Sequence, residues 1–522
     1  ATCVVDKNIY AFCCLKDDYV KAQVVDNWSQ IFNETYDEFR EENQNDQEDF
    51  SGWFNSYDHT PIPLEQMQEW RENTIDRINR IKGKRIFEIG CGTGLLLHKL
   101  AKDAEKFTGI DISDVAIENL RKEIKEAGLK NTEVYCGAAD DLDAYKNERY
   151  DTIIINSVIL FFDNTEYLLN VIQQCKEMLV DGGCLFIGDV RNYAMLELFN
   201  ASVILYNRGE DNNEKLLERI KKRMEREKEL LVAPSFFRDV TKTIPEFNRV
   251  VIHSKEAQFD NELTKFRYDV VLHKNCKNEK RKEILFEGTP SEQKIIEAIE
   301  KENNVKITNV EHKYVVREYE QLCAVKGVSS KKLKKHLNNE SIPYDYYMFA
   351  KRYGYDCCVE TQEDGLMCVR IGKDVESDCS NAKIIDVHSK EYTNVPYKEL
   401  TYEFIADEIM NYAKKYLPEY MVPNHIHIVE KLPQLKNGKI DRLLLKKLAD
   451  ENRKQIDVEV PISKNDIGEY LRALYKQMLH VEVDDTISFF QAGGHSLLAM
   501  QLLNKVKREL QVNIHLSEFM KH

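Results

Sequence analysis

The sequence lacks the features of membrane, secreted and zinc-binding proteins. No apolar run approaches the roughly 20 residues of a membrane-spanning helix, and no basic-plus-apolar signal segment opens the chain. The 13 cysteines include no C-x-x-C pair, so we expect reduced thiols rather than a metal site or a disulfide framework. Internal repeats and low-complexity tracts are absent as well. These absences predict a cytoplasmic protein that has no membrane partner and binds no metal.

Positive charge is scarce relative to negative charge. The 522 residues include 74 lysines and arginines against 89 aspartates and glutamates, a formal net charge of −15. This excess of acid disfavours nucleic acid or an anionic membrane as the main partner. The remaining composition, 43% hydrophobic and 31% charged, is ordinary for a globular protein. The length predicts three or four domains.

The first half of the chain shows clear strand and helix patterns. Residues 1–18 predict two short strands, which cannot bury a core alone and must join a sheet elsewhere. Residues 64–82 predict a helix. Strand and helix patterns then alternate over 83–190, and further strands continue to about 273, as in a doubly wound α/β sheet.

The second half shows shorter patterns. Residues 276–391 predict a small α+β appendage with helices near 291–302 and 344–353 and two strands, "YDCCVET" and "LMCVRIGK". Another helix is expected over 398–418, and a final helical unit starts at about 464. We could assign no chemistry to the appendage from its residues.

A glycine-rich loop follows the first strand of the α/β region. In "FEIGCGTG" the glycines Gly90, Gly92 and Gly94 have G-x-G-x-G spacing, which allows a tight turn and close approach of a ligand. The next strand ends in "GIDIS", which places Asp111 where a carboxylate can bind ribose hydroxyls. After the third strand, "CGAADDL" offers Asp140 to an adenine amino group. For the loop alone, a structural turn is an equal alternative, but the ordered set favours a nucleotide site.

This series of motifs resembles the class I S-adenosylmethionine-dependent methyltransferases. The resemblance implies that Glu88, Gly90 and Gly92 flank the methionine end of the donor, Asp111 the ribose and Asp140 the adenine. The complete set of donor-binding residues that it implies is Glu88, Gly90, Cys91, Gly92, Gly94, Asp111, Ile112, Asp140 and Asn156.

Longer stretches are similar to the methyltransferase domains embedded in nonribosomal peptide synthetases. The segment "ESIPYDYYMFAKRYGYDCCVE" resembles the C-terminal appendage of these domains. The resemblance implies a methyltransferase core over 26–275 and an appendage over 276–391. The stretches that resemble the core are "FSGWFNSYDHTPIPLEQMQEW" (50–70), "NSVILFF" (156–162), "GDVRN" (188–192) and "NELTKFRYDVVL" (261–272).

Two motifs near the end resemble the last part of an adenylation domain of the same synthetases. They are "LPEYMVP" and "LPQLKNGKIDR", and the resemblance implies that Lys439 reaches the acyl carboxylate and phosphate during adenylate formation. Residues 1–25 and 392–452 would then form one small α+β adenylation subdomain, interrupted by the methyltransferase. Because the chain starts at Ala1 within a strand pattern, we expect a fragment that lacks the large adenylation core.

The segment "FFQAGGHSLLAMQLL" (489–503) resembles the attachment motif of peptidyl carrier proteins. The resemblance implies that a phosphopantetheinyl transferase attaches 4′-phosphopantetheine to Ser496, in an all-α carrier bundle over 464–522 after a linker over 453–463. Free N–H groups favour a phosphate at a helix N-terminus; an ordinary N-cap serine is the alternative. The chain ends near the expected start of the last carrier helix, which we therefore expect to be missing.

Together the motifs predict a multidomain protein that methylates an aminoacyl thioester held on the arm of Ser496. The insertion point resembles the N-methylating arrangement, and an α-amine, with a pKa of about 7.7–8, needs little acid–base help. Candidates for contact with the acceptor are Asn156, Asp189, Arg191 and Tyr57, each with a structural hydrogen bond as its alternative. Methylation of oxygen or carbon, and an inactive spacer, stay open. Expected partners are the adenylation core, neighbouring synthetase domains and a small synthetase accessory protein.

Overall fold

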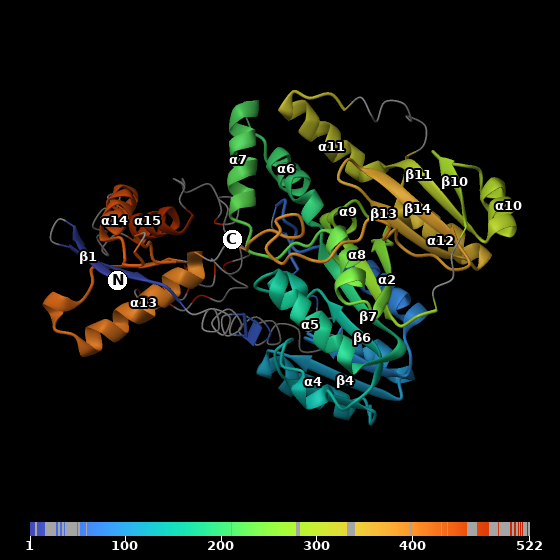
Figure 1. Cartoon of the computed structure of the whole chain (residues 1–522), viewed down its shortest axis with the longest axis horizontal. Helices are drawn as coiled ribbons and strands as arrows, with labels where there is room; N and C mark the ends of the chain where they lie inside the picture. Colours follow the sequence, from blue (N-terminus) through green and yellow to red (C-terminus); the bar gives the residue numbers. More distant parts are fainter. Residues whose placement is uncertain are drawn as a thin grey trace. The chain divides into compact units, whose positions relative to one another are not determined.

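The computed structural model forms two compact units, residues 1–39 with 398–522 and residues 40–397 (Figure 1). No described helix is long and apolar enough to cross a membrane. The structure describes residues 1–5, 8–15, 53–58, 60–209, 211–277, 282–330, 340–396, 399–429, 431–435, 437–456 and 467–479, with isolated positions between 28 and 50 and between 489 and 519.

A seven-stranded sheet organises the unit formed by residues 40–397. Its strand order is β5-β4-β3-β6-β7-β9-β8, and only β9 runs antiparallel to its neighbours. The predicted α/β domain is therefore confirmed, with a mixed sheet. The strands are β3 (Arg85–Ile89), β4 (Lys106–Asp111), β5 (Thr132–Cys136), β6 (Tyr150–Asn156), β7 (Leu179–Arg191), β8 (Phe247–Ser254) and β9 (Arg267–Lys274).

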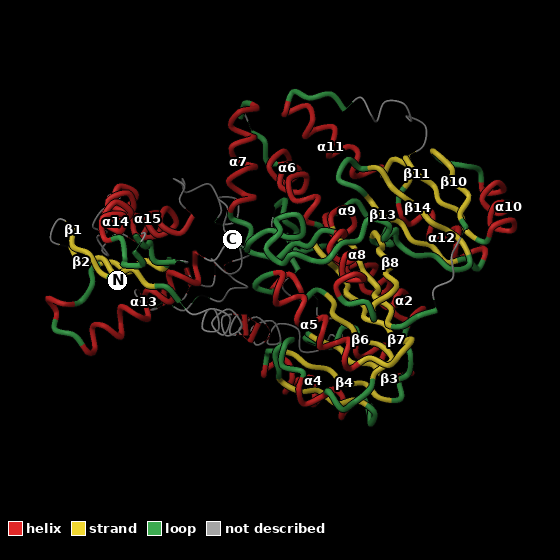
Figure 2. The backbone as a smooth tube through the Cα atoms, viewed as in Figure 1, coloured by secondary structure: helices red, strands yellow, loops and turns green. Residues whose placement is uncertain are grey.

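Helices cover both faces of this sheet, which explains the unbroken apolar runs in its strands (Figure 2). In β6, Ile153 and Ile155 pack on one face with helices α5 (Thr165–Met178) and α8 (Pro234–Thr243). Ile154 packs on the other face, with α2 (Leu64–Ile81), the short α3 (Leu97–Leu100) and α4 (Asp114–Glu126). All three isoleucines are completely buried. The polar residue that ends this strand, Asn156, therefore lies at a fixed position at the sheet edge.

A helical layer follows β7. It consists of α6 (Leu196–Tyr206) and α7 (Asn213–Glu225), and it packs with α11 (Lys313–Lys326) from the later part of the chain (Figure 1). Although α7 is densely charged, Leu216 and Ile220 are buried in this layer. Tyr57 packs against the same cluster.

The appendage has its own sheet, with strands in the order β10-β11-β14-β13. The two helices and two strands predicted here are present; β10, β11 and α11 were not predicted, because their apolar positions are few and interrupted by charge. Edge strand β13 lies along β8, where the backbone N–H of Thr361 donates to Ser254 Oγ at 3.0 Å. The elements are β10 (Glu283–Glu287), α10 (Glu292–Glu302), β11 (Asn304–His312), β12 (Glu340–Ser341), α12 (Pro343–Tyr353), β13 (Asp356–Thr361) and β14 (Leu366–Gly372).

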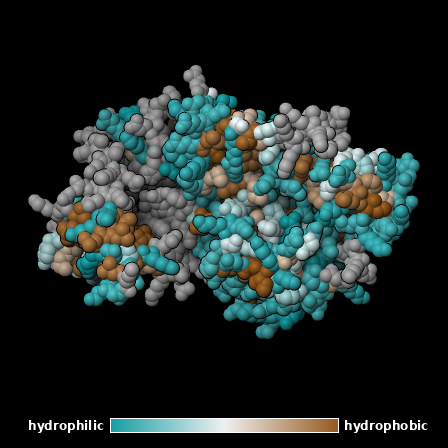
Figure 3. Space-filling model, turned by 45° about the horizontal axis from the view of Figure 1, so that its top comes forward, coloured by the Kyte–Doolittle hydropathy of each residue, from teal (hydrophilic) through white to brown (hydrophobic). Residues whose placement is uncertain are grey.

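The segment after β14 returns to the methyltransferase-like core. Ile385 and Tyr392 belong to the same hydrophobic cluster as β6 and α5. The Tyr392 hydroxyl donates to Asp239 on α8 at 2.8 Å. The visible face of this unit is mostly hydrophilic, with separate hydrophobic areas (Figure 3).

The other unit joins segments from both ends of the chain. Strands β1 (Thr2–Val5) and β2 (Asn8–Cys13) pair with each other, and β2 pairs in parallel with β15 (His425–Ile428). The N-terminal strand pair thus finds its sheet more than 400 residues later, where the backbone N–H of Ile9 donates to Asn424 Oδ1 at 2.7 Å.

Helices α13 (Glu399–Tyr416) and α14 (Arg442–Ile456) contact this sheet, and α15 (Ile467–Leu479) follows them in the chain. Helix α14 continues through Ile456, into the segment predicted as a linker from 453, because the charged residues there are good helix formers. Leu474 of α15 packs with Ala499 and Leu502 of the predicted attachment motif.

Candidate functional site

The predicted donor-binding residues converge at the carboxyl ends of adjacent parallel strands. Glu88 lies near the end of β3, Asp111 ends β4 and Asn156 ends β6. Strand β3 lies between β4 and β6 in the sheet. Ligands of open α/β sheets bind at this end of the strands, so these residues share one candidate site.

The glycine loop needs glycine at its defining positions. Gly90, Gly92 and Gly94 have φ values of +74°, +48° and +84°, a region that other residues rarely adopt. A Cβ at Gly90 would lie 2.2 Å from Val158 Cγ2. The backbone N–H groups of Gly90 and Cys91 donate to Ile110 O at 2.7 and 3.0 Å. Hydrogen bonds to Ile110 therefore fix the glycine loop against β4, with its backbone at the end of the sheet where Glu88 and Asp111 lie.

Asp111 fixes the geometry of this loop. Its Oδ2 accepts a hydrogen bond from the Gly92 N–H at 2.8 Å, and its Oδ1 accepts one from the Ser113 N–H at 2.9 Å. Burial raises the pKa of Asp111, and these backbone hydrogen bonds oppose the rise. The Ile112 backbone N–H is a further donor to this carboxylate, and of its roughly four lone-pair sites at least one remains for a ligand hydroxyl. Ile112 is half-buried beside it, and the contact with ribose stays a prediction.

Glu88 has a buried carboxyl group, one oxygen of which has no hydrogen-bond partner in the part of the chain that the structure describes. The residue is 3% exposed, and this oxygen is Oε2. Burial, and then the neighbouring Asp111, raise the pKa of Glu88 to about 8. A buried acceptor without a partner is unfavourable. A ligand that carries a positive charge and hydroxyl groups would supply the partners that both carboxyl groups can accept. Glu88 and Asp111 therefore fit such a ligand.

Two further residues predicted to bind the donor are Asp140, which has a hydrogen-bond partner within the protein, and Cys91, which is buried. The Tyr167 hydroxyl on α5 donates to Asp140 Oδ1 at 2.8 Å, which holds the loop after β5 against the helix. Cys91 is buried, and burial raises the pKa of its thiol well above the ordinary value. Their contacts with the donor stay predictions.

Asn156 presents an oriented amide oxygen. Its Nδ2 donates to Ser157 Oγ at 3.2 Å, and that hydroxyl donates to Asp189 Oδ2 at 3.0 Å. This series of hydrogen bonds fixes the orientation of the Asn156 amide. Asp189 as a carboxylate can only accept a hydrogen bond, so the Ser157 hydroxyl donates to it and accepts from the amide nitrogen of Asn156. The Oδ1 of Asn156 is buried and has no hydrogen-bond partner among the described residues. The site therefore offers one fixed hydrogen-bond acceptor.

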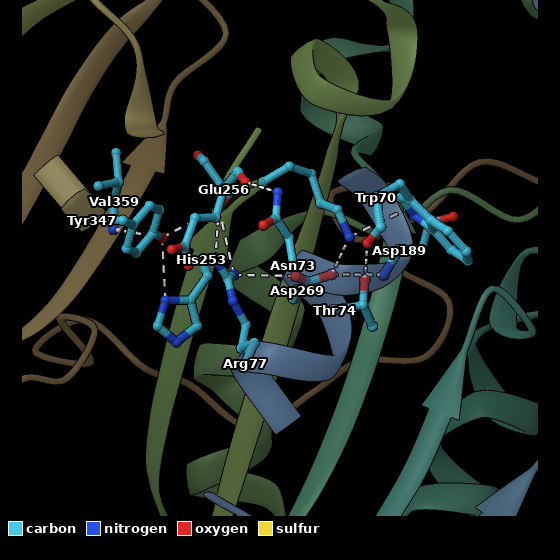
Figure 4. Close-up of polar contacts among 12 residues, drawn as sticks. Trp70, Asn73, Thr74, Arg77, Asp189, His253, Glu256, Asp269, Tyr347 and Val359 are labelled. Carbon is cyan, nitrogen blue, oxygen red and sulfur yellow. Dashed lines mark hydrogen bonds and ion pairs between the residues drawn. The ribbon is translucent and has the colours of Figure 1, made fainter. Parts of the chain in front are cut away.

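Asp189 is fully buried and fully occupied, so it cannot serve as a general base as it stands. Its Oδ1 accepts from Trp70 Nε1 at 3.0 Å (Figure 4). Its Oδ2 accepts from Ser157 and Arg267. Burial opposes its ionisation, but Arg267 and Lys255 outweigh burial and hold the pKa of Asp189 below its ordinary value. Ser157 and Asp189 both have positive φ, +57° and +61°, which is uncommon outside glycine and asparagine.

The other two candidates for contact with the methyl acceptor, Arg191 at the end of β7 and Tyr57 before α2, pack against the helical layer. The Arg191 guanidinium donates to both oxygens of Glu227, at 3.0 and 2.9 Å, and also pairs with Glu229. The Tyr57 hydroxyl lies 3.2 Å from Ser202 Oγ on α6. These contacts match the structural alternative for both residues.

The two remaining predicted site residues, Lys439 and Ser496, fall in the sequence range of the other unit. Lys439 is exposed in a turn closed by a hydrogen bond from Leu435 N–H to Lys439 O at 2.7 Å. Ser496 lies outside the residues that the structure describes.

Several polar residues of the site were not predicted. They are Trp70, Arg77, Ser157, Lys255, Arg267 and Asp269. The one available signal was Asp269, an acid inside the buried strand β9.

Comparisons with known proteins match two separate parts of the chain to two families. A family described as "Methyltransferase domain" matches residues 81–339, and one described as "Phosphopantetheine attachment site" matches residues 469–522. The nonribosomal peptide synthetase CymA of Salinispora arenicola is 30% identical over 511 residues, which are 94% of this chain and 6% of CymA. Nonribosomal peptide synthetase asqK of Emericella nidulans is 26% identical over 91% of this chain and 20% of its own length. Cyclosporin synthetase simA of Tolypocladium inflatum is 26% identical over 90% of this chain and 3% of its own.

The fold, the site and these matches define an S-adenosylmethionine-dependent methyltransferase domain together with a phosphopantetheine attachment site. The chain belongs to the nonribosomal peptide synthetases, in which it corresponds to a methyltransferase domain followed by a carrier domain. It spans 3% to 20% of the length of the three relatives named above.

Proposed function

We propose that this methyltransferase transfers a methyl group to the α-amine of an amino acid held as a thioester on the phosphopantetheine arm of Ser496. The observation that carries the proposal is the oriented Oδ1 of Asn156, buried and without a described partner at the end of β6. An amine N–H is a donor that matches this oxygen. The acceptor nitrogen would then be held with its lone pair free.

S-adenosylmethionine supplies a methyl group already activated by its sulfonium. Glu88, Asp111 and the glycine loop would hold it, since its positive charge and ribose hydroxyls match what these residues lack. The protein then has little proton transfer to perform before the reaction, because about half or more of an α-amine with a pKa of about 7.7–8 is the free base at pH 8. Catalysis consists mainly of holding the nitrogen in line with the methyl group.

Two features disfavour two of the alternative functions, methylation of carbon and an inactive spacer. Methylation of carbon requires a strong base, whereas the carboxylate beside Asn156, that of Asp189, is already bound by Trp70, Ser157 and Arg267. An inactive spacer does not require Gly90 to adopt a positive φ beside Val158, or Glu88 to be buried without a partner. These features support an active methyltransferase.

The other unit supports the proposed domain arrangement. We assign residues 1–25 and 392–452 to one adenylation subdomain interrupted by the methyltransferase, because β2 pairs with β15 across the insertion. We assign the methyltransferase core to 26–275, the appendage to 276–391 and an all-α carrier to 464–522. The proposed partners are the adenylation core, neighbouring synthetase domains, a phosphopantetheinyl transferase and a small accessory protein.

The test uses the chain with an aminoacyl phosphopantetheine loaded on Ser496. Intact-mass analysis should show the gain of one methyl group in the presence of S-adenosylmethionine. Asn156→Ala should lower the rate by about 10- to 100-fold, or about 1.4–2.7 kcal/mol of transition-state stabilisation, with a smaller effect on donor binding. The matched control is Asn131→Ala, since Asn131 binds backbone carbonyls of Ala101 and Ala104. Donor binding without any methyl gain in the wild type would contradict the proposal.

A further inference from the structure

The appendage inserts a buried tyrosine into the methyltransferase core. Tyr347 on α12 is 2% exposed, and its hydroxyl lies 3.2 Å from both His253 Nδ1 and Ser254 O on β8. The same hydroxyl accepts a hydrogen bond from the Val359 N–H of β13 at 3.3 Å. Tyr347 therefore joins the appendage sheet to the edge of the core sheet.

An arginine links this tyrosine to the core. The Arg77 guanidinium on α2 lies over the Tyr347 ring, 5.0 Å from its centroid. It donates to Ser254 O at 3.4 Å and to Asp269 Oδ2 at 3.1 Å. Arg77 is 3% exposed and Asp269 is 2% exposed, so solvent does not weaken this ion pair.

Asp269 connects Arg77 to Asp189, which lies beside the proposed position of the methyl acceptor. Its Oδ1 accepts from the backbone N–H of Asp189 at 2.8 Å and from Lys255 Nζ at 2.9 Å. Asp189 in turn accepts a hydrogen bond from the Ser157 hydroxyl, and this hydroxyl orients the Asn156 amide. Figure 4 shows the contacts from Tyr347 through Arg77 and Asp269 to Asp189.

A second connection leaves the appendage independently. Glu318 on α11 accepts from Lys265 Nζ at 2.7 Å, and Lys265 also pairs with Asp260 at 2.9 Å. The same ammonium lies 5.5 Å from the ring centroid of Tyr57. Two elements of the appendage thus contact segments that hold acceptor-site candidates.

We propose that the appendage is a positioning element of the acceptor site, with Tyr347 acting through Arg77, Asp269 and Asp189 to hold the Asn156 amide in place. This inference rests on the proposed role of Asn156 in methyl transfer. It gives the appendage a function that its sequence did not indicate. Tyr347 is a positioning residue, since its contacts are with Arg77, Val359 and β8.

The hydroxyl of Tyr347 is the suitable point to perturb. Removing one charge from a buried ion pair strongly destabilises a protein. Tyr347→Phe instead keeps the ring beneath Arg77 and removes only the hydroxyl, which shares the Ser254 carbonyl oxygen with the Arg77 guanidinium and so helps to hold it. We expect the methyl-transfer kcat on the loaded carrier to fall by about 2- to 30-fold. The calorimetric dissociation constant for S-adenosylmethionine should change by less than about twofold, because the donor loop lies outside this chain of contacts. The matched control is Tyr346→Phe, a buried tyrosine on the same helix whose hydroxyl is near Ser341 and Thr289.

A double-mutant cycle separates positioning from general destabilisation. If Tyr347 acts through Asn156, Tyr347→Phe should have little further effect on kcat in an Asn156→Ala background. Equal factors in both backgrounds, an equal loss in Tyr346→Phe, or no loss in Tyr347→Phe would each overturn the inference. A wild-type carrier that gains no methyl group would overturn the proposed function and this inference together. A methyl group found on another atom would overturn only the nitrogen assignment, because the cycle can still be measured.

Discussion

Gly188→Ala is the sharpest perturbation of the acceptor site that leaves every polar group intact. Gly188 on β7 is the direct register partner of Asn156 on β6. A Cβ at this position would lie 2.2 Å from Asn156 Oδ1 and 2.5 Å from Phe186 Cε1. The substitution therefore pushes on the atom proposed to hold the acceptor amine, and on a core ring beside it.

The geometry sets the expected size of the effect. For ordinary van der Waals contact the Asn156 oxygen must move by about 1 Å, and a misplacement of about 1 Å can lower a rate by about 100-fold. Overpacking a core typically costs about 1–3 kcal/mol of unfolding free energy. For a domain of this size, each kcal/mol corresponds to a fall in Tm of about 2–4 °C.

The assay compares methyl transfer to the loaded carrier, donor binding by calorimetry, and Tm. We expect a large loss of kcat, a donor affinity close to that of the wild type, and a modest fall in Tm. The control for destabilisation is Gly128→Ala, since Gly128 has φ +68° and its Cβ would meet no atom within 4 Å. If Gly188→Ala methylates as fast as Gly128→Ala, the placement of Asn156 Oδ1 does not matter for the reaction, and the reasoning is refuted.

Three further predictions concern the donor and the carrier. Because the pKa of Glu88 is raised to about 8, its carboxyl group should be protonated in the ligand-free protein at pH 7, and a cationic donor should displace that proton. Donor affinity should then rise with pH up to about 8 and level off above it, and calorimetry should show less proton release in Glu88→Gln; equal proton release in both would contradict the assignment. Asp111→Ala should weaken donor binding by about 1.5–3 kcal/mol through the loss of a charge-assisted acceptor, and an unchanged affinity would remove its role. A phosphopantetheinyl transferase with coenzyme A should modify Ser496 and leave Ser496→Ala unmodified in peptide mapping, whereas a modified Ser496→Ala chain would show that the motif was misassigned.

The placement of the residues proposed to bind the donor could be predicted because its information is local. The spacing of Gly90, Gly92 and Gly94 requires a particular backbone, and Asp111 follows in the next strand of an unbroken α/β pattern. It was also predictable that the two strands within residues 1–18 need a sheet elsewhere, whereas their particular partner, β15, is a finding of the structure.

The acceptor half depends on contacts between distant residues, which a single sequence does not reveal. Asp189 and Asp269 are 80 residues apart, and Arg77 and Asp269 are 192 apart. Nothing in their local sequence indicates that they meet in a buried network. For the same reason Arg191 was a candidate for acceptor contact, although the structure pairs it with Glu227 and Glu229.

The atom that receives the methyl group is the most direct test of the account. The chain is loaded at Ser496 with an aminoacyl phosphopantetheine and incubated with S-adenosylmethionine, and the amino acid is then released and compared with N-methyl, O-methyl and C-methyl standards. The account predicts the N-methyl amino acid, formed at a rate that falls as the pH drops below the pKa of the amine, because only the free base has a lone pair. A methyl group on carbon or on a side-chain oxygen would contradict it.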